Sequence, residues 1–251
     1  MKLILCKDQK DLGIRSATHT AELINKAIAE KGSARLLLST GASQFPFFEE
    51  FVKCDIDWGR VEVFHLDEYV GISKEHPASF NNYLTNRFVN KVSLKNHHLI
   101  DGTSLPEETI AALTKLLDES PIDVGLIGIG ENAHIAFNDP PADFEDKSAY
   151  KVVTLAERCL EQQIGEGWFK SKDECFKQAI SMTCHRIMQS KHIISVVPYK
   201  VKAEAIYNTF ANDVTPDIPA TLLKKHCDAT VYVDSDSAEL LTEELIEKYQ
   251  N

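Results

Sequence analysis

The stretch from Ile122 to Pro141 constrains this chain more than any other segment. A continuous apolar run over residues 124–129 is typical of a strand that is buried on both faces of a parallel sheet. Gly128 and Gly130 then allow a tight turn at the carboxyl end of that strand, where open α/β sheets bind their ligands. Polar side chains crowd the residues that follow, namely Glu131, Asn132, His134, Asn138 and Asp139. The stretch therefore predicts a strand followed by an active-site loop.

Two other interpretations of this stretch compete with that one. Gly128, Gly130 and Ala133 match the Gly-x-Gly-x-x-Ala spacing of a dinucleotide-binding turn. Such a turn opens a regular helix, whereas Pro140 and Pro141 follow closely here and interrupt any helix. Nicotinamide or flavin binding is therefore disfavoured, and we expect no cofactor. A purely structural loop, in which the histidine of the stretch is an ordinary hydrogen-bonded side chain, stays open as the second alternative.

Charge balance and cysteine usage narrow the class of protein. The 251 residues suit one large α/β domain or two small ones, and the formal net charge is −11. This acidic balance disfavours nucleic acid or an anionic membrane as a partner. The six cysteines form no Cys-x-x-Cys pair and no zinc-like spacing with histidine, so we expect a reducing compartment and no metal site. No signal peptide or membrane-spanning pattern is recognisable, which favours a soluble cytoplasmic protein.

Strand and helix patterns alternate along the chain. Short apolar, β-branched runs predict strands at residues 2–6, 34–38, 61–65, 124–129, 150–154, 192–197 and 229–233. Apolar residues at helical spacing predict helices at residues 11–31, 79–89, 106–117, 200–210 and 238–249. This β-α-β-α order predicts an α/β fold, with a Rossmann-like, mostly parallel sheet and helices on both faces. We expect a single domain spanning residues 1–251.

A second polar loop, residues 39–44, follows the predicted strand at residues 34–38. Gly41 permits close backbone approach, hydroxyl groups flank it, and a helix is predicted to begin just after the loop. Helix N-termini carry unpaired N–H groups and partial positive charge, which suits a phosphate group. The loop lacks the Gly-Lys-Ser/Thr of a Walker motif. Ordinary helix capping by Ser43 is the structural alternative.

A third polar loop, residues 65–71, carries the adjacent carboxylates Asp67 and Glu68. Neighbouring side chains point in different directions on any regular element, so one carboxylate can face a site while the other holds a structural partner. A turn with two solvated acids is the alternative. All three polar loops follow predicted parallel strands, so we expect them at one edge of the sheet.

Three motifs together closely resemble those of glucosamine-6-phosphate deaminases. They are Leu-Asp-Glu-Tyr-Val-Gly at residues 66–71, His-Pro-x-Ser at 76–79 and Gly-x-Gly-x-x-x-His-Ile-Ala-Phe-Asn at 128–138. The similarity extends over about residues 36–210. The wider superfamily includes the 6-phosphogluconolactonases, which share the fold and the Gly-x-Gly-x-x-x-His segment but continue differently after the histidine. The deaminase branch is therefore the closer resemblance.

The resemblance implies conversion of glucosamine 6-phosphate, or a close relative, and water into fructose 6-phosphate and ammonium, without metal or cofactor. It assigns ring opening to His134 and proton transfer between C2 and C1 to Asp67, roles that suit an imidazole and a carboxylate. Asp139 is implied to hold or polarise His134, and Asn132 completes the implied catalytic set. The implied phosphate-binding residues are Ser39, Thr40, Gly41, Ala42, Ser43 and Lys200.

The sequence departs from that family pattern around the histidine and in the segment beyond it. Asn132 stands where many members carry aspartate, and Asp139 where they often carry glutamate. The best-known family members also carry an arginine in a lid segment, and this arginine binds the phosphate. This sequence has no arginine at the corresponding position, although Arg158 lies nearby. We expect residues 158–169 to close over the substrate, because Gly165 and Gly167 allow a hinge. The residues expected to supply apolar cover and polar contacts there are Gln162, Gln163, Glu166, Trp168 and Phe169.

Two functions of other classes stay open. One is a lactone hydrolase of the 6-phosphogluconolactonase type. The other is a non-catalytic sugar-phosphate sensor, which the lack of a basic helix-turn-helix extension disfavours. The ligand expected in every case is a small sugar phosphate. The sequence does not decide which sugar is bound or whether binding is under allosteric control. It also leaves the oligomeric state open, and a homo-oligomer is one option.

Overall fold

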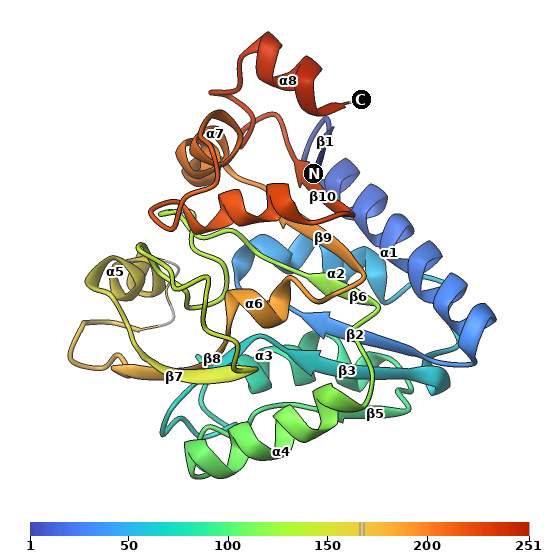
Figure 1. Ribbon diagram of the computed structural model, residues 1–251. Helices are drawn as coiled ribbons and strands as arrows, with labels where there is room; N and C mark the ends of the chain where they lie inside the picture. Colours follow the sequence, from blue (N-terminus) through green and yellow to red (C-terminus); the bar gives the residue numbers. More distant parts are fainter. Residues whose placement is uncertain (166, 168, 251) are drawn as a thin grey trace.

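The computed structural model describes residues 1–165, 167 and 169–250, apart from the side chains at positions 158, 159, 162 and 163. A seven-stranded sheet forms its centre, in the order β1-β10-β9-β6-β2-β3-β5 (Figure 1). The strands are β1 (Lys2–Leu5), β2 (Ala34–Leu38), β3 (Val61–His65), β5 (Asn96–His98), β6 (Val124–Leu126), β9 (His192–Val197) and β10 (Ala229–Val233). Every neighbouring pair in this sheet is parallel, which confirms the predicted α/β class.

Helices cover both faces of the main sheet (Figure 1). They are α1 (Gln9–Lys31), α2 (Phe45–Phe51), α3 (Phe80–Arg87), α4 (Pro106–Glu119), α5 (Glu157–Gly165), α6 (Cys184–Ile187), α7 (Ala203–Ala211) and α8 (Glu243–Gln250). Side chains alternate along a strand, so Leu36 and Leu38 pack in one core with α1, α2 and α3, whereas Leu37 packs in the other with α4, α6 and α7. Burial of each such leucine contributes about 1.5–3 kcal/mol.

A second, three-stranded sheet is antiparallel and separate from the first. It consists of β4 (Asp67–Tyr69), β8 (Gln178–Met182) and β7 (Tyr150–Thr154), in that order. The sequence predicted residues 150–154 as one more strand of a mostly parallel sheet, without this separate arrangement. In β7, Tyr150 is buried while Val152 is exposed, as expected for a strand with one face in water. This small sheet carries Asp67 beside the end of β3.

The register of the central strands brings the polar loops together. Leu38 at the end of β2 pairs with His65 at the end of β3, and Leu37 pairs with Gly125 of β6. The Leu66 N–H also donates to the Leu38 carbonyl at 3.1 Å. The loops that follow β2, β3 and β6 therefore start at the same edge of the sheet. None of the helices within the described residues has the length and apolarity needed to cross a membrane.

Candidate active site

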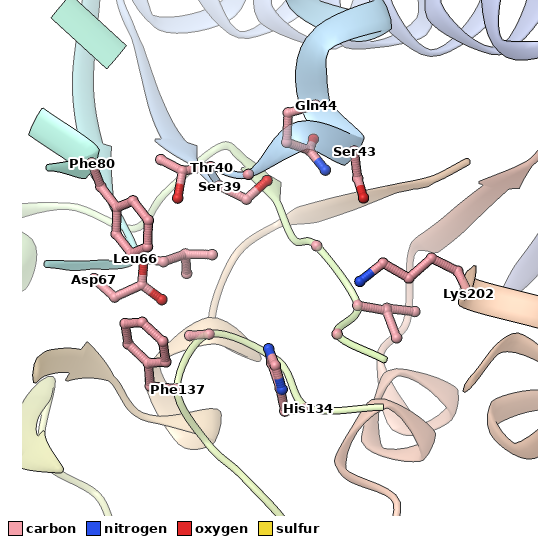
Figure 2. A pocket seen from close by; sticks show the side chains of 15 residues that line it. Ser39, Thr40, Ser43, Gln44, Leu66, Asp67, Phe80, His134, Phe137 and Lys202 are labelled. Atoms are coloured by element: carbon pink, nitrogen blue, oxygen red, sulfur yellow. The ribbon is translucent and has the colours of Figure 1, made fainter. Parts of the chain in front are cut away.

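Figure 2 shows a pocket at this edge whose walls come from all three loops. The loops contribute Ser39, Thr40, Gly41, Ser43, Gln44, Leu66, Asp67, Gly128, Ile129, Gly130, His134, Ala136 and Phe137. Phe80, from the start of α3, and Lys202, from the 3₁₀ turn Lys200–Lys202, complete the lining. A carboxylate, an imidazole, an ammonium group and several hydroxyls therefore share one cavity. That combination suits proton transfer on a polar, anionic substrate.

The His134 turn is compact and does not start a helix. The His134 carbonyl accepts from the Gly130 N–H at 2.9 Å, and Ala133 adopts a left-handed φ of 62°. The imidazole lies directly over the turn: a Cβ atom built on Gly130 would approach its Cε1, Nε2 and Nδ1 atoms to 2.2–2.4 Å. Only a glycine at this position leaves room for the ring. The missing helix also removes the main feature of a dinucleotide-binding turn.

His134 is held by an amide and a carboxylate behind the pocket. Its Nδ1 lies 2.5 Å from the Asn132 Oδ1 and 3.3 Å from the Asp139 Oδ1. The Asn132 amide nitrogen donates to Asp139 at 3.0 Å, so the amide oxygen is the atom that faces the imidazole. Because that oxygen can only accept, the Nδ1 of His134 is the donor in this contact, and in the neutral imidazole Nε2 is then the acceptor. Burial raises the pKa of Asp139, but hydrogen bonds and charge from His134 and Asn132 outweigh it and lower the pKa overall.

The two adjacent carboxylates have different environments. Asp67 lines the pocket beside the rings of Phe80 and Phe137, and burial, followed by the charge of Glu68, raises the pKa of Asp67 to about 8 (Figure 2). Glu68 is fully buried and accepts hydrogen bonds from the Ser79 hydroxyl and from three backbone N–H groups at residues 69, 80 and 81. Glu68 therefore holds the start of α3, while Asp67 faces the cavity. One carboxylate in the site and one with a structural partner is the arrangement expected from the sequence, because adjacent side chains point in different directions.

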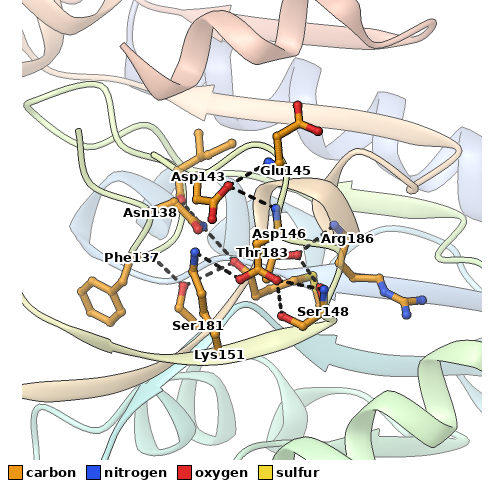
Figure 3. Close-up of polar contacts among 12 residues, drawn as sticks. Phe137, Asn138, Asp143, Glu145, Asp146, Ser148, Lys151, Ser181, Thr183 and Arg186 are labelled. Atoms are coloured by element: carbon orange, nitrogen blue, oxygen red, sulfur yellow. Dashed lines mark hydrogen bonds and ion pairs between the residues drawn. The ribbon is translucent and has the colours of Figure 1, made fainter. Parts of the chain in front are cut away.

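The segment after His134 is fastened to the small sheet (Figure 3). The Asn138 amide donates to the Met182 carbonyl at 2.8 Å and to the Ile135 carbonyl at 3.0 Å. The Phe137 N–H donates to the Ser181 hydroxyl at 3.0 Å. These bonds fix the loop that carries the histidine against β8, so Asn138 has a structural function here.

The loop after β2 contributes hydroxyl-bearing side chains to the pocket lining. Ser39 is buried, and its Oγ has no hydrogen-bond partner among the described residues. Gly41 adopts φ 97° and ψ 167°, a conformation almost confined to glycine, and turns its carbonyl to the Tyr83 hydroxyl at 2.9 Å. The short 3₁₀ turn Ala42–Gln44 and α2 both lack a side-chain cap, so the alternative of capping by Ser43 is not observed. Ala42 belongs to the loop but does not line the cavity.

The lysine of the pocket is Lys202 and not Lys200. The Lys200 side chain is 73% exposed and pairs with Glu239 at 2.9 Å, away from the cavity. Lys202 is buried, and Figure 2 shows its ammonium group directed into the pocket. Side chains two positions apart in a 3₁₀ turn point in different directions, so only one lysine of the pair can face inward. The Lys-Val-Lys sequence shows both candidates but carries no signal that selects between them.

The expected lid is described only in part. The side chains of Arg158, Gln162 and Gln163, together with the whole of Glu166 and Trp168, lie outside the described residues. Phe169 is buried, and its ring centroid lies 5.6 Å from that of Tyr69 and 5.9 Å from that of His76. It packs in an aromatic cluster beside the small sheet and does not line the pocket. Phe80, Phe137, Gln44 and Lys202 are lining residues that the sequence did not single out as site residues.

The fold and this set of residues define a family. The family model for glucosamine-6-phosphate isomerases/6-phosphogluconolactonase matches residues 7–232, so the chain belongs to that family. A glucosamine-6-phosphate deaminase of Clostridium acetobutylicum is 32% identical over 249 residues, which cover 96% of this chain and 100% of that protein. A glucosamine-6-phosphate deaminase of Streptococcus pyogenes is 35% identical over 242 residues, with 96% and 100% coverage.

Solved structures give the same assignment of the fold. A monomeric glucosamine-6-phosphate deaminase superimposes with a TM-score of 0.87 at 30% identity, covering 96% of this chain and 100% of that protein. The 6-phosphogluconolactonase of Trypanosoma brucei gives a TM-score of 0.79 at 14% identity, covering 96% and 98%. At that identity the likeness to the lactonase concerns the fold alone. Among the described residues, no cluster of three His, Cys, Asp or Glu side chains could hold a metal ion.

Proposed function

We propose that the chain is a glucosamine-6-phosphate deaminase, which converts glucosamine 6-phosphate and water into fructose 6-phosphate and ammonium. The observation that carries this proposal is the pocket that brings Asp67, His134, Lys202 and the hydroxyls of the Ser39–Ser43 loop into one cavity. The relatives at 32–35% identity that bear this name support it over nearly their whole length.

Ring opening is the task of His134. Its Nε2 accepts the proton of the anomeric hydroxyl and returns a proton to the ring oxygen, which yields the open-chain aldehyde. The Nδ1 proton stays on the hydrogen bond to Asn132, and the nearby Asp139 carboxylate stabilises the imidazolium that forms in between. Asn132 therefore fixes the tautomer, while Asp139 supplies the charge.

Proton transfer along the open chain is the task of Asp67. Its carboxylate removes the proton from C2 while the C1 oxygen takes up a proton from water, giving an enolamine. The same carboxyl then delivers its proton to C1 while the amino nitrogen returns one to water, giving an imine at C2. Water then adds to the imine carbon and ammonia leaves, which completes the ketose. Burial in a pocket lined by Phe80 and Phe137, followed by the charge of Glu68, raises the pKa of Asp67 and makes it a stronger base than a solvated carboxylate.

In this proposal the phosphate lies against Lys202 and the Ser39–Ser43 loop. Lys202 supplies a buried positive charge, and Ser39, Thr40 and Ser43 supply hydroxyl donors. A lysine acts on phosphate as a point charge where an arginine would give a bidentate fork. Anchoring the phosphate orients C1 and C2 toward the catalytic groups, since remote binding energy can be used for positioning.

The decisive experiment measures ammonium release from a panel of amino-sugar phosphates, with 6-phosphogluconolactone hydrolysis followed alongside. We expect ammonium from glucosamine 6-phosphate and fructose 6-phosphate as the co-product in equal amount. Hydrolysis of the lactone without ammonium release would replace the proposal with a lactonase. Sugar-phosphate binding with neither reaction would indicate a sensor. A cytoplasmic location goes with the proposal, because the described cysteines are free thiols, as is usual in reducing compartments.

A further inference from the structure

Tyr199 has the most unusual backbone conformation near the pocket. It adopts φ 82° and ψ 143°, at the border of a region that is almost confined to glycine. A non-glycine residue held there costs about 1–3 kcal/mol and persists only when its surroundings enforce the conformation. The other described non-glycine residues with positive φ are Ala133 and Ala136, which flank His134. Strained backbone in this chain is therefore gathered around the site.

A buried carboxylate holds one side of Tyr199. The Tyr199 N–H lies 3.3 Å from the Oδ1 and 3.2 Å from the Oδ2 of Asp234, which directly follows β10 and is 1% exposed. The Ser237 N–H donates to the same Oδ1 at 2.8 Å and fixes the carboxylate. Asp234 thus anchors the strained peptide to the end of a central strand.

The rest of Tyr199 contacts both halves of the proposed phosphate site. Its hydroxyl donates to the Ala42 carbonyl at 3.3 Å, within the loop that carries Ser39 and Ser43. Its own carbonyl accepts from the Lys202 N–H at 3.0 Å, which closes the 3₁₀ turn that directs Lys202 inward. One residue therefore joins the loop to the lysine.

We infer that Tyr199, anchored by Asp234, is a positioning residue that sets the spacing between the Lys202 ammonium group and the Ser39–Ser43 loop and thereby sets affinity for the substrate phosphate. The inference rests on the proposed function for the identity of the ligand. The chain keeps a strained tyrosine because its ring and hydroxyl preorganise the site, which lowers the cost of ordering it on binding.

The test measures inorganic phosphate binding by calorimetry and steady-state kinetics with glucosamine 6-phosphate in three variants. Tyr199→Gly suits the backbone and removes the ring, Tyr199→Phe removes only the hydroxyl, and Tyr207→Phe on α7 is the control. We expect Tyr199→Gly to raise KM and the phosphate Kd about tenfold, and Tyr199→Phe a few-fold, the scale of a lost hydrogen bond. In both variants kcat stays within about twofold, because Asp67 and His134 are unchanged. Thermal unfolding of each variant, measured alongside, checks that the protein is folded.

A double-variant comparison locates the effect. In a Lys202→Ala background, Tyr199→Gly should add little to the phosphate Kd, since coupled residues are not additive. Unchanged phosphate Kd and KM in Tyr199→Gly would overturn the inference, as would a loss confined to kcat. If wild type releases no ammonium from any amino-sugar phosphate but phosphate binding still weakens in the Tyr199 variants, the proposed function fails and the positioning role stands.

Discussion

At the scale of single residues, the adjacent carboxylates of Asp67 and Glu68 differ in chemistry because their surroundings differ. Asp67 and Glu68 are both buried, but Glu68 has four hydrogen-bond donors whereas Asp67 faces the pocket. Burial raises the pKa of both groups, and hydrogen bonds partly offset this for Glu68. Asp67 is therefore the carboxylate available to move a substrate proton.

Asp67→Asn tests that assignment. An amide keeps the shape but cannot accept the C2 proton, so we expect kcat to fall by about 10²–10⁴-fold. Binding of fructose 6-phosphate should change only a few-fold. In wild type, kcat/KM should rise with pH through the Asp67 pKa of about 8, because the base must be ionised. Stopped assays across pH measure both the loss of kcat and the pH dependence of kcat/KM. Asp236→Asn, at an exposed position, is the control. More than half the wild-type activity in Asp67→Asn would refute the role of Asp67 as the base.

The two lysines of the Lys-Val-Lys turn provide a matched pair. Lys202 is buried in the pocket, whereas Lys200 is exposed and paired with Glu239. Lys202→Ala should raise KM about tenfold to a hundredfold, the scale of a lost charge-assisted hydrogen bond. Lys200→Ala should leave KM unchanged, since an exposed ion pair contributes little. The reverse pattern in the two KM values would place the phosphate elsewhere.

At the scale of elements, the turn after β6 depends on close approach of backbone and side chain. The His134 ring covers Gly130 so closely that no Cβ atom fits there. The same turn holds two left-handed alanines, and its continuation is fastened to β8 by Asn138. The position of the imidazole is therefore a property of the whole turn.

Gly130→Ala should displace the His134 ring while leaving the sheet intact. We expect kcat to fall about 10²-fold, the scale of a misplacement of about 1 Å, with a modest decrease in melting temperature. Gly59→Ala in the 3₁₀ turn Trp58–Arg60 is the control, because a Cβ atom there makes only an ordinary contact, 3.4 Å from the Asp57 Oδ1, and the residue lies outside the pocket lining. Near wild-type kcat in Gly130→Ala would show that ring placement tolerates the added methyl group.

At the scale of the whole molecule, the buried titratable groups link stability to pH. The folded-state pKa of Asp67, about 8, lies above its ordinary value of 3.8. The folded protein therefore retains a proton that the unfolded chain has lost, and this contribution to stability is complete below about pH 4 and is lost as the pH rises through about 8. His65 acts in the opposite sense, since burial lowers its pKa to about 3 and acid favours unfolding.

Asp67→Asn should remove the pH dependence of stability that comes from Asp67. Relative to wild type, the variant should gain free energy of unfolding between pH 5 and pH 9, on the order of several kcal/mol, because an amide has no charge to desolvate. Urea unfolding at several pH values measures the difference. A pH-independent difference between variant and wild type would mean that Asp67 titrates normally in the folded protein. A more stable but inactive variant would indicate that this part of the site is built at the expense of stability.

The sequence alone determined the features that depend on local pattern. Apolar runs and helical spacing predicted the parallel strands other than β5, and most helices, because both periodicities are properties of neighbouring residues. The polar loops followed the strands in the order that an α/β sheet requires, so the meeting of Ser39, Asp67 and His134 was predictable. The roles assigned to these residues stay predictions until the variants are measured.

The tertiary structure decided what depends on distant partners. The antiparallel pairing of β8 with β4 and β7 joins segments far apart in the chain, and no local pattern reports it. Lys202, and not Lys200, lines the pocket, and the turn that carries both lysines begins at Tyr199, whose N–H contacts Asp234 directly after β10. The basicity of Asp67 follows from its burial beside Glu68 and the aromatic rings, because a pKa reports the surroundings of a group in space and not its neighbours in the sequence.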